Sequence, residues 1–396
     1  MSLTKVSYSI INGASVNVLD FGADASGTLD SYSAFASAWN AVKLTGGVLY
    51  IPPGDYLLNS QWVCEISSFK NIKITGFGAT LFAGPLVTGH AIKILNSFNQ
   101  TILDIDGLNF NHINNTTVAG CFLLSGAHCV HITSCNVEFF DTKAGYSFAL
   151  LESSVPGDGA FNCFWCSIEN CNTRTRSGDS PADYGVILLG AANATKIQQN
   201  QFSALNTAIY IKTDDLVASD YGLANGVIIS ENDFEDITNV AVQIQGQAGY
   251  LGITGLRVIA NRIESCPTFV SFVTNNGSPC LTHATPPILM ANYGAGDTVT
   301  WLDNLTNYTF TVFESINPGY SPTVQNNWIQ NGEIKLTVGD TYGFKVVNSS
   351  GNADYSVAYY QMGSYRYWTN AGDGYLYVNT LVPTSGADGQ IVGTQA

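Results

Sequence analysis

Ile197–Phe202 reads IQQNQF, Ile229–Phe234 reads ISENDF and Val258–Ile263 reads VIANRI. In each stretch an apolar residue is followed three positions later by asparagine and five positions later by a second apolar residue. Looser copies, with Phe, Leu or Cys in the middle, extend the pattern back to Ile74. Successive middle residues lie 27 to 36 positions apart. A period of that size is typical of solenoids and propellers.

A second short apolar run separates the copies of the pattern. These runs are Phe148–Leu150, Val186–Leu188, Ile209–Ile211, Val242–Ile244 and Phe269–Phe272. They are too short for a blade of four strands, and no helix of about 10 to 12 residues fits between them, so we expect a parallel β-helix. Equivalent residues of such a fold stack about 4.8 Å apart. Asn200, Asn232 and Asn261 are therefore predicted to form an internal amide ladder, with Cys135 and Cys171 in the earlier coils.

Composition and charge favour an all-β chain and exclude several classes of protein. The 396 residues include 39 Gly, 20 Tyr and 20 Phe, and only 11% are charged, which argues against a disordered chain or a helical bundle. A formal net charge of -15 argues against nucleic acid as a partner. The sequence has no run of 18 apolar residues and no signal peptide at its start, so membrane insertion is not expected. Nine cysteines without zinc-type spacing predict no metal and no cofactor.

Four regions are expected along the chain. Asp30–Val42 has apolar residues at helical spacing, which predicts an N-terminal capping helix, with Asp30 or Ser31 as its N-cap. After Gly277 the repeat is lost, and short strands separated by turns predict a C-terminal β-sandwich. The predicted regions are a leader and cap at 1–60, the parallel β-helix at 61–278, the β-sandwich at 279–382 and an extended tail at 383–396.

Two stretches near the start resemble a known superfamily. Asn17–Ala23 (NVLDFGA) and Gly46–Tyr56 (GGVLYIPPGDY), with the capping helix between them, resemble the opening of pectate-lyase-like proteins. The preceding Leu3–Ile11 (LTKVSYSII) resembles the leader of phage tailspike and tail fibre proteins of that superfamily. The opening motif contains no catalytic group that can be transferred to this chain.

The resemblance implies a right-handed parallel β-helix, usually a homotrimer, that binds and often cleaves bacterial surface polysaccharide. It further implies a virion protein that is assembled in the host cytoplasm, docks on other phage tail proteins and acts outside the bacterium.

Glycoside hydrolysis needs two carboxyl groups, which neighbouring coils can supply. If Ile209 and Ile211 face the core, Tyr210 and Lys212 face outward, and Gln243 and Gln245 lie on the next coil of the same face. Long segments follow this face after Glu152 and Lys212, and extra length at a solenoid edge often carries function. The predicted catalytic residues are Glu152, Asp214 and Asp215. The predicted substrate-binding residues are Asp158, Tyr210, Lys212, Asp220, Gln243, Gln245 and Trp165.

Other interpretations of these residues stay open. Arg174, Arg176, Asp179 and Asp183 form a secondary candidate, which is either a salt-bridged turn or a site for an acidic sugar. Lys212 and Tyr210 are also the groups that an elimination reaction would use, so a polysaccharide lyase is an alternative. The histidines share no evident coil position with a carboxylate cluster, and His128 and His131 are interpreted as structural. A non-catalytic receptor-binding spike or a structural tail component is the remaining alternative.

Overall fold

The computed structural model describes residues 15–66, 70–96, 101–111, 117–139, 145–152, 163–190, 192–212, 224–245, 253–273, 288–290 and 292–295. Beyond them it describes only the strands that lie between 299 and 393. The predicted site residues Asp158, Asp214, Asp215 and Asp220 lie outside the described residues, as does the leader Leu3–Ile11.

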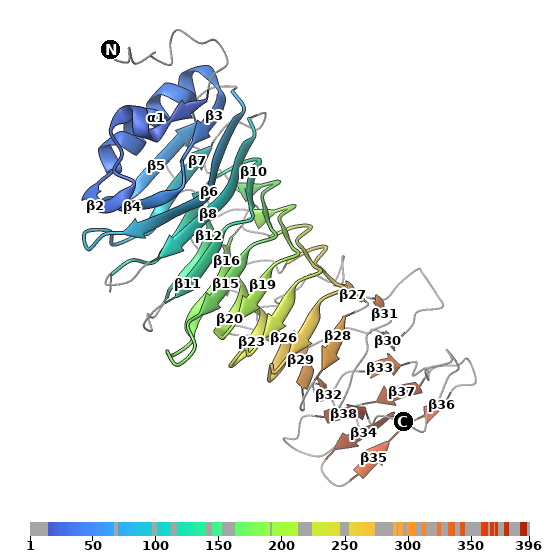
Figure 1. Ribbon diagram of the computed structural model, residues 1–396. Helices are drawn as coiled ribbons and strands as arrows, with labels where there is room; N and C mark the ends of the chain where they lie inside the picture. Colours follow the sequence, from blue (N-terminus) through green and yellow to red (C-terminus); the bar gives the residue numbers. More distant parts are fainter. Residues whose placement is uncertain are drawn as a thin grey trace, which may run out of the picture.

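The N-terminal end of the solenoid is covered by helix α1 (Tyr32–Thr45), as Figure 1 shows. Ala34, Phe35, Ala38, Trp39 and Val42 are the buried residues of α1, which confirms the predicted amphipathic face. The helix begins after Ser31 as expected, although a side-chain oxygen of Asp30 accepts the hydrogen bond from the Tyr32 amide (3.0 Å). Rings on α1 pack against the first coils, where Phe35 contacts Trp62 edge to face at 5.1 Å.

Each coil contributes strands to two long sheets, called sheet A and sheet B, and the strands pair in parallel along the solenoid (Figure 1). Sheet A contains β1 (Val16–Asn17), β2 (Ser26–Asp30), β3 (Gly47–Tyr50), β4 (Gly54–Leu58), β6 (Ile72–Ala83), β8 (Leu103–Asn111), β10 (Val130–Thr133), β11 (Asn136–Phe139), β14 (Ser167–Glu169), β15 (Asn172–Thr175), β18 (Lys196–Gln198), β19 (Gln201–Ser203), β21 (Ile228–Ser230), β22 (Asp233–Glu235), β24 (Arg257–Ile259) and β25 (Arg262–Glu264).

Sheet B holds the second apolar run of every repeat. Its strands include β5 (Trp62–Ile66), β7 (His90–Asn96), β9 (Gly120–Ser125), β12 (Ser147–Glu152), β16 (Ala182–Leu189), β20 (Leu205–Lys212), β23 (Val240–Gln245) and β26 (Thr268–Val273). Two short strands, β13 (Cys163–Phe164) and β17 (Ala192–Asn193), pair separately. The predicted all-β parallel β-helix is confirmed, and the first apolar residue of each copy of the pattern is fully buried from Ile105 to Val258.

The predicted asparagine ladder runs inside the solenoid and is one coil longer than expected. The side-chain amides of Asn200, Asn232 and Asn261 donate to the side-chain oxygens of Asn232, Asn261 and Asn292 at 3.0, 3.0 and 2.9 Å. The backbone amides of the same three residues donate to the same oxygens at 3.0 Å. All four asparagines are buried, so their polar groups are satisfied within the protein.

Cys135 and Cys171 occupy the equivalent inward positions of the two earlier coils, as predicted. Both side chains are buried, and burial raises the pKa of the Cys135 thiol. The eight cysteines within the described residues are free thiols. Seven of them are buried and act as small apolar core residues, whereas Cys129 is half-buried.

A residue with left-handed backbone precedes each inward position from Cys135 to Asn261. Ser134, Asn170, Gln199, Glu231 and Ala260 have φ values between 52° and 58°. Such a conformation costs a non-glycine residue about 1–2 kcal/mol. The ladder hydrogen bonds on the next residue offset this cost, and the tight turn keeps the coils in register.

The coils continue past the boundary predicted at residue 278. β27 (Ile288–Met290) pairs in parallel with β24, and β28 (Tyr293–Ala295) pairs in parallel with β25. In sheet B, β29 (Val299–Leu305) pairs in parallel with β26. The boundary is therefore wrong. Gly294 takes the last apolar position of the repeat and hides this copy in the sequence.

The remaining strands extend the same two sheets. They are β30 (Thr311–Phe313), β31 (Thr323–Gln325), β32 (Gly332–Leu336), β33 (Thr341–Phe344), β34 (Ala358–Met362), β35 (Tyr365–Tyr367), β36 (Thr369–Asn370), β37 (Leu376–Asn379) and β38 (Gly389–Gly393). Antiparallel pairing begins with β32 and β38, and continues with β33 and β37. The tail predicted at 383–396 thus contributes a paired strand, so that part of the prediction is wrong. The β-sandwich stays a prediction for the antiparallel strands.

Asp24 holds the loop that leads into the cap. Its carboxylate accepts hydrogen bonds from the backbone amides of Leu29 (2.7 Å), Ser26 (3.0 Å) and Thr28 (3.1 Å). The bonds from Leu29 and Ser26, with those from Thr28, hold the pKa of Asp24 well below its usual value. A carboxyl group whose pKa is lowered in the native state stabilises the fold when the pH lies above its pKa in the unfolded chain, which is about 4. This stabilisation is lost as the pH falls through the native pKa.

Asp24→Asn should therefore lower the melting temperature at neutral pH, because an amide oxygen accepts these hydrogen bonds less strongly than a carboxylate. The difference from wild type should be constant above about pH 5 and should shrink below about pH 4. Calorimetry of both proteins across this range measures it. Glu65→Gln, at an exposed position of β5, is the control and should change little. A difference that grows in acid would contradict the role of Asp24.

Candidate functional site

Four of the predicted site residues lie together on the outward face of sheet B. Tyr210 pairs in register with Gln243, and Lys212 pairs with Gln245. Along β20, Ile209 and Ile211 alternate with Tyr210 and Lys212. The two isoleucines are fully buried, whereas Tyr210 and Lys212 are half-buried. The outward orientation predicted for this group is confirmed.

Glu152 belongs to the same outward face. It pairs with Leu189, and Leu189 pairs with Lys212, so the three residues form one column across neighbouring coils. At about 4.8 Å for each coil, the backbones of Glu152 and Lys212 lie about 9.6 Å apart. Asp214 and Asp215 follow Lys212 by two and three residues in the sequence.

Tyr210 is fixed on both sides. Its hydroxyl donates to Oε1 of Gln245, and its ring stacks on that of Tyr184 with centroids 5.3 Å apart and planes at 24°. Burial, together with the neighbouring Tyr184, raises the pKa of Tyr210 to about 12. Tyr210 therefore keeps its proton at neutral pH and acts as a hydrogen-bonding group.

An apolar column lies beside the polar residues. Leu123, Leu150 and Ile187 pair in register, and Tyr210 continues the column on the next coil. Ile187 is only 8% exposed although it points outward, so other side chains cover it. The face thus combines an apolar floor with a few polar groups, which is the usual composition of a small-molecule or sugar site.

The secondary candidate does not form one convergent site in the described residues. Arg174 on β15 makes an ion pair with Glu138 (2.8 Å), and a carboxylate oxygen of Asp183 on β16 accepts from the Gly145 amide (2.6 Å). The backbone amide of Asp179 donates to the carbonyl of Arg176 (3.1 Å). Arg174 and Asp183 thus bind groups outside the turn, which supports a structural role for this segment over a site for an acidic sugar.

Trp165 points outward, with 53% of its surface exposed. It lies on the corner between β13 and β14, so it is not a residue of the sheet B face that carries Tyr210. Its ring contacts Phe164 at 5.8 Å.

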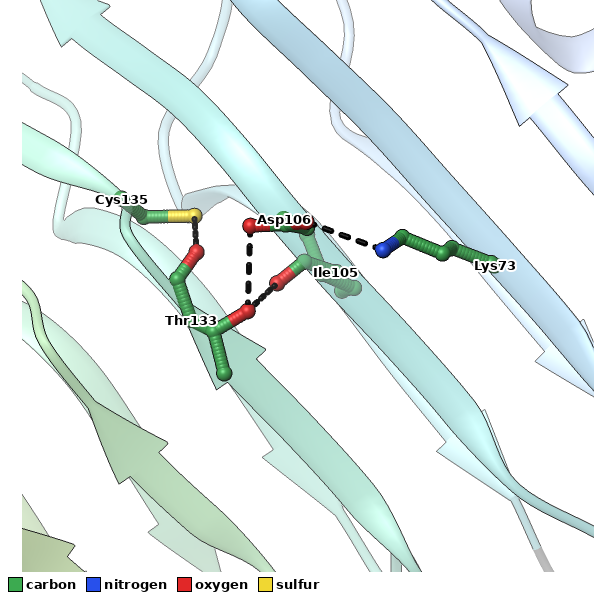
Figure 2. A network of polar contacts seen from close by, with 5 residues as sticks. All are labelled: Lys73, Ile105, Asp106, Thr133 and Cys135. Carbon is green, nitrogen blue, oxygen red and sulfur yellow. Dashed lines mark hydrogen bonds and ion pairs between the residues drawn. The ribbon is translucent and has the colours of Figure 1, made fainter.

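A polar cluster on the outward face of sheet A was not predicted. His131 pairs in register with one carboxylate residue, Asp104, and its Nδ1 lies 2.8 Å from Oγ of Ser167. On the same strand as Asp104, Asp106 makes an ion pair with Lys73 (2.9 Å) and accepts from the hydroxyl of Thr133 (3.2 Å), as Figure 2 shows. Because Ile105 and Ile132 are equivalent positions of the repeat, the residues before them could have been aligned from the sequence.

No metal or membrane feature accompanies these clusters. Within the part of the chain that the structure describes, no three His, Cys, Asp or Glu side chains are grouped so as to hold a metal ion. In the same residues, no helix has the length and apolar character needed to span a bilayer.

Known proteins match the N-terminal part of the sequence. Residues 15–121 match the family described as rhamnogalacturonase A/epimerase, pectate lyase-like. Rhamnogalacturonase A of Aspergillus niger is 51% identical over 81 residues, which are 20% of this chain and 17% of that protein. A polygalacturonase of Prunus persica is 31% identical over 129 residues, which are 31% of this chain and 30% of that protein. The chain spans less than a third of the length of these relatives.

The fold is similar over almost the whole length of a solved structure. A hyperthermoactive exopolygalacturonase of Thermotoga maritima aligns with 93% of this chain and 95% of its own, with a TM-score of 0.54 and 13% identity. At this identity the likeness concerns the fold alone. The family match includes Asn17–Ala23 and Gly46–Tyr56, the two stretches that predicted the superfamily, whereas Leu3–Ile11 lies outside it. The chain thus shares the fold of this exopolygalacturonase, a parallel β-helix, and its residues 15–121 are similar to the rhamnogalacturonase A/epimerase, pectate lyase-like family.

Proposed function

We propose that this protein binds a polysaccharide on the outward face of sheet B and hydrolyses it with two carboxyl groups. One observation carries the proposal: Glu152 and Lys212 share a column two coils apart, and Asp214 and Asp215 follow Lys212 directly in the sequence. The backbones of Glu152 and Lys212 lie about 9.6 Å apart, which is close to the separation of about 6.5–9.5 Å between the two carboxyl groups of inverting enzymes. The matched relatives, named as a rhamnogalacturonase and a polygalacturonase, support cleavage of a glycan.

In this proposal one carboxyl group protonates the oxygen of the leaving sugar, and the other activates a water molecule on the opposite side of the ring. Lys212, Gln243 and Gln245 bind substrate hydroxyl or acidic groups, together with Asp158 and Asp220. The raised pKa of Tyr210 argues against its use as the base of an elimination, and Lys212 is then the group that the lyase alternative would need.

We further propose that the protein is a phage tailspike that acts on host capsule or lipopolysaccharide glycan. The leader Leu3–Ile11 supports this setting, in which the chain is a virion component docked on other tail proteins. As a tailspike it should be a homotrimer, and light scattering at micromolar concentration should report about three chains. A stable monomer would contradict this part of the proposal.

The function is tested with purified bacterial capsule, lipopolysaccharide glycan, rhamnogalacturonan and polygalacturonate. New reducing ends without absorbance from unsaturated uronate support hydrolysis. Unsaturated products would instead identify a lyase, and retention of a glycan without any product would identify a receptor-binding spike. The absence of both binding and products with all four glycans would favour a structural tail component.

A further inference from the structure

The ring of Tyr184 lies on the outward face of sheet B, because it stacks on Tyr210. Its backbone pairs in register with Ser147 and Thr207, which are buried, at the opposite end of the strand from the Glu152 column. Tyr184 is the third residue of β16, and Leu189, which stands between Glu152 and Lys212, is the last. Five residues of extended strand place Tyr184 about 16 Å from that column. This distance separates the backbones. The ring of Tyr184 reaches from there toward Tyr210, and Tyr210 in turn lies between it and Gln245 of the Lys212 column, so Tyr184 is placed to contact a neighbouring unit of the same polysaccharide.

The ring of Tyr184 has a fixed position. It stacks on Tyr210, whose hydroxyl in turn donates to Gln245. The backbone amide of Tyr184 also donates to the carbonyl of Tyr146 (3.0 Å), which ties β16 to the preceding coil. An aromatic ring that is held before the ligand arrives loses little conformational entropy on binding.

The two rings remain partly exposed beside an apolar floor. Tyr184 and Tyr210 are each half-buried. Ile187, which pairs in register with Tyr210 and follows Tyr184 by three residues on β16, is only 8% exposed. Sugar rings present apolar C–H groups as well as hydroxyls, so a paired tyrosine platform with its hydroxyls at the rim offers both kinds of contact.

We propose that Tyr184, supported by Tyr210, forms a sugar-stacking subsite that binds a unit of the polysaccharide away from the cleaved bond. This inference rests on the proposed function. It adds a binding residue to the site and assigns Tyr184 to affinity, with no part in the chemical step. Tyr184 should therefore act on substrate binding, and turnover at saturating substrate should remain near the wild-type value.

The test compares Tyr184→Leu with Tyr184→Phe in the full chain. Affinity electrophoresis in gels that contain bacterial capsule, lipopolysaccharide glycan, rhamnogalacturonan or polygalacturonate measures the dissociation constant. Tyr184→Leu should weaken binding about tenfold, because the aromatic contact is lost. Tyr184→Phe keeps the ring and should stay within about threefold of wild type. Phe77→Leu removes another exposed ring, 57% exposed on β6 of sheet A, and should leave binding unchanged.

The outcomes separate this inference from the proposed function. Retention of wild type with equal retention of Tyr184→Leu overturns the subsite and leaves the proposed function standing. Equal loss in Tyr184→Leu and Phe77→Leu also overturns it, because the effect would then not be specific to sheet B. No retention of wild type in any gel overturns both. A thermal melt of each variant shows whether a loss of binding reflects a loss of fold. If Tyr184→Leu is unstable, Tyr184→Phe still tests the inference, because the inference requires that Tyr184→Phe bind the glycan about as tightly as wild type.

Discussion

Glu152→Gln should reduce the turnover of the polysaccharide by at least about 10²-fold while leaving its binding nearly unchanged. The exchange keeps the shape of the side chain but removes the proton transfer that a carboxyl group contributes, which is typically about 10²–10⁴-fold in rate. Binding depends on many other polar and apolar contacts across sheet B, so the dissociation constant should change little. Reducing-end assays at saturating substrate, with affinity electrophoresis in parallel, measure the two quantities.

Asp214→Asn and Asp215→Asn test the second carboxyl group of the pair. One of the two should match the loss in Glu152→Gln, because two-carboxylate hydrolysis fails when either partner is missing. Glu169→Gln is the matched control, since Glu169 is a half-buried outward carboxylate on β14 of sheet A. Full activity in all three site variants would contradict two-carboxylate hydrolysis on this face of sheet B.

Asn232→Ala should lower the free energy of unfolding by about 2–5 kcal/mol. The side chain accepts from the backbone amide of Asn200 (3.0 Å) and donates to the carbonyl of Ile197 (2.9 Å). Alanine leaves both buried backbone groups without this partner and also breaks the two side-chain bonds to Asn200 and Asn261. Urea unfolding followed by circular dichroism measures the change.

Asn136→Ala is the control for the ladder. Asn136 is an exposed asparagine whose side chain donates to Oδ1 of Asn109 (3.0 Å) on the surface of sheet A. Its removal should change the unfolding free energy by no more than about 0.5 kcal/mol, because water replaces the lost bond. Equal effects of Asn136→Ala and Asn232→Ala would show that the internal asparagine ladder contributes no more to the free energy of unfolding than a single hydrogen bond between surface asparagines.

Much of the solenoid was predictable because its interior repeats by residue type. Apolar residues on either side of each ladder position, such as Ile197 and Phe202, face the core in every coil, and this alternation is visible in the sequence. The coil at Asn292 does not match the repeat pattern, because Gly294 stands where the pattern has its second apolar residue. Backbone pairing does not need a side chain at that position. The same reason makes the end of a solenoid hard to place from sequence alone.

The candidate site was predictable only as far as the strands reach. Alternation along β20 and β23 placed Tyr210, Lys212, Gln243 and Gln245 on one face. Tyr184 and Tyr210 belong to different coils and do not pair in register. Their positions therefore do not recur with the repeat, and the sequence does not indicate that the two rings stack. The partner of Arg174 is Glu138 on the preceding coil, and no local spacing indicates that pair.

The hydrogen bonds that join one asparagine of the ladder to the next all point the same way along the solenoid. Each asparagine donates to the oxygen of the coil that follows it in the chain. A partly built protein that ends in the coil of Asn232 therefore presents two N–H groups, one from the backbone and one from the side chain, where the oxygen of Asn261 will sit. The open end of the solenoid therefore offers hydrogen-bond donors at the position where the next coil binds. Its direction of growth matches the order in which a ribosome delivers the chain.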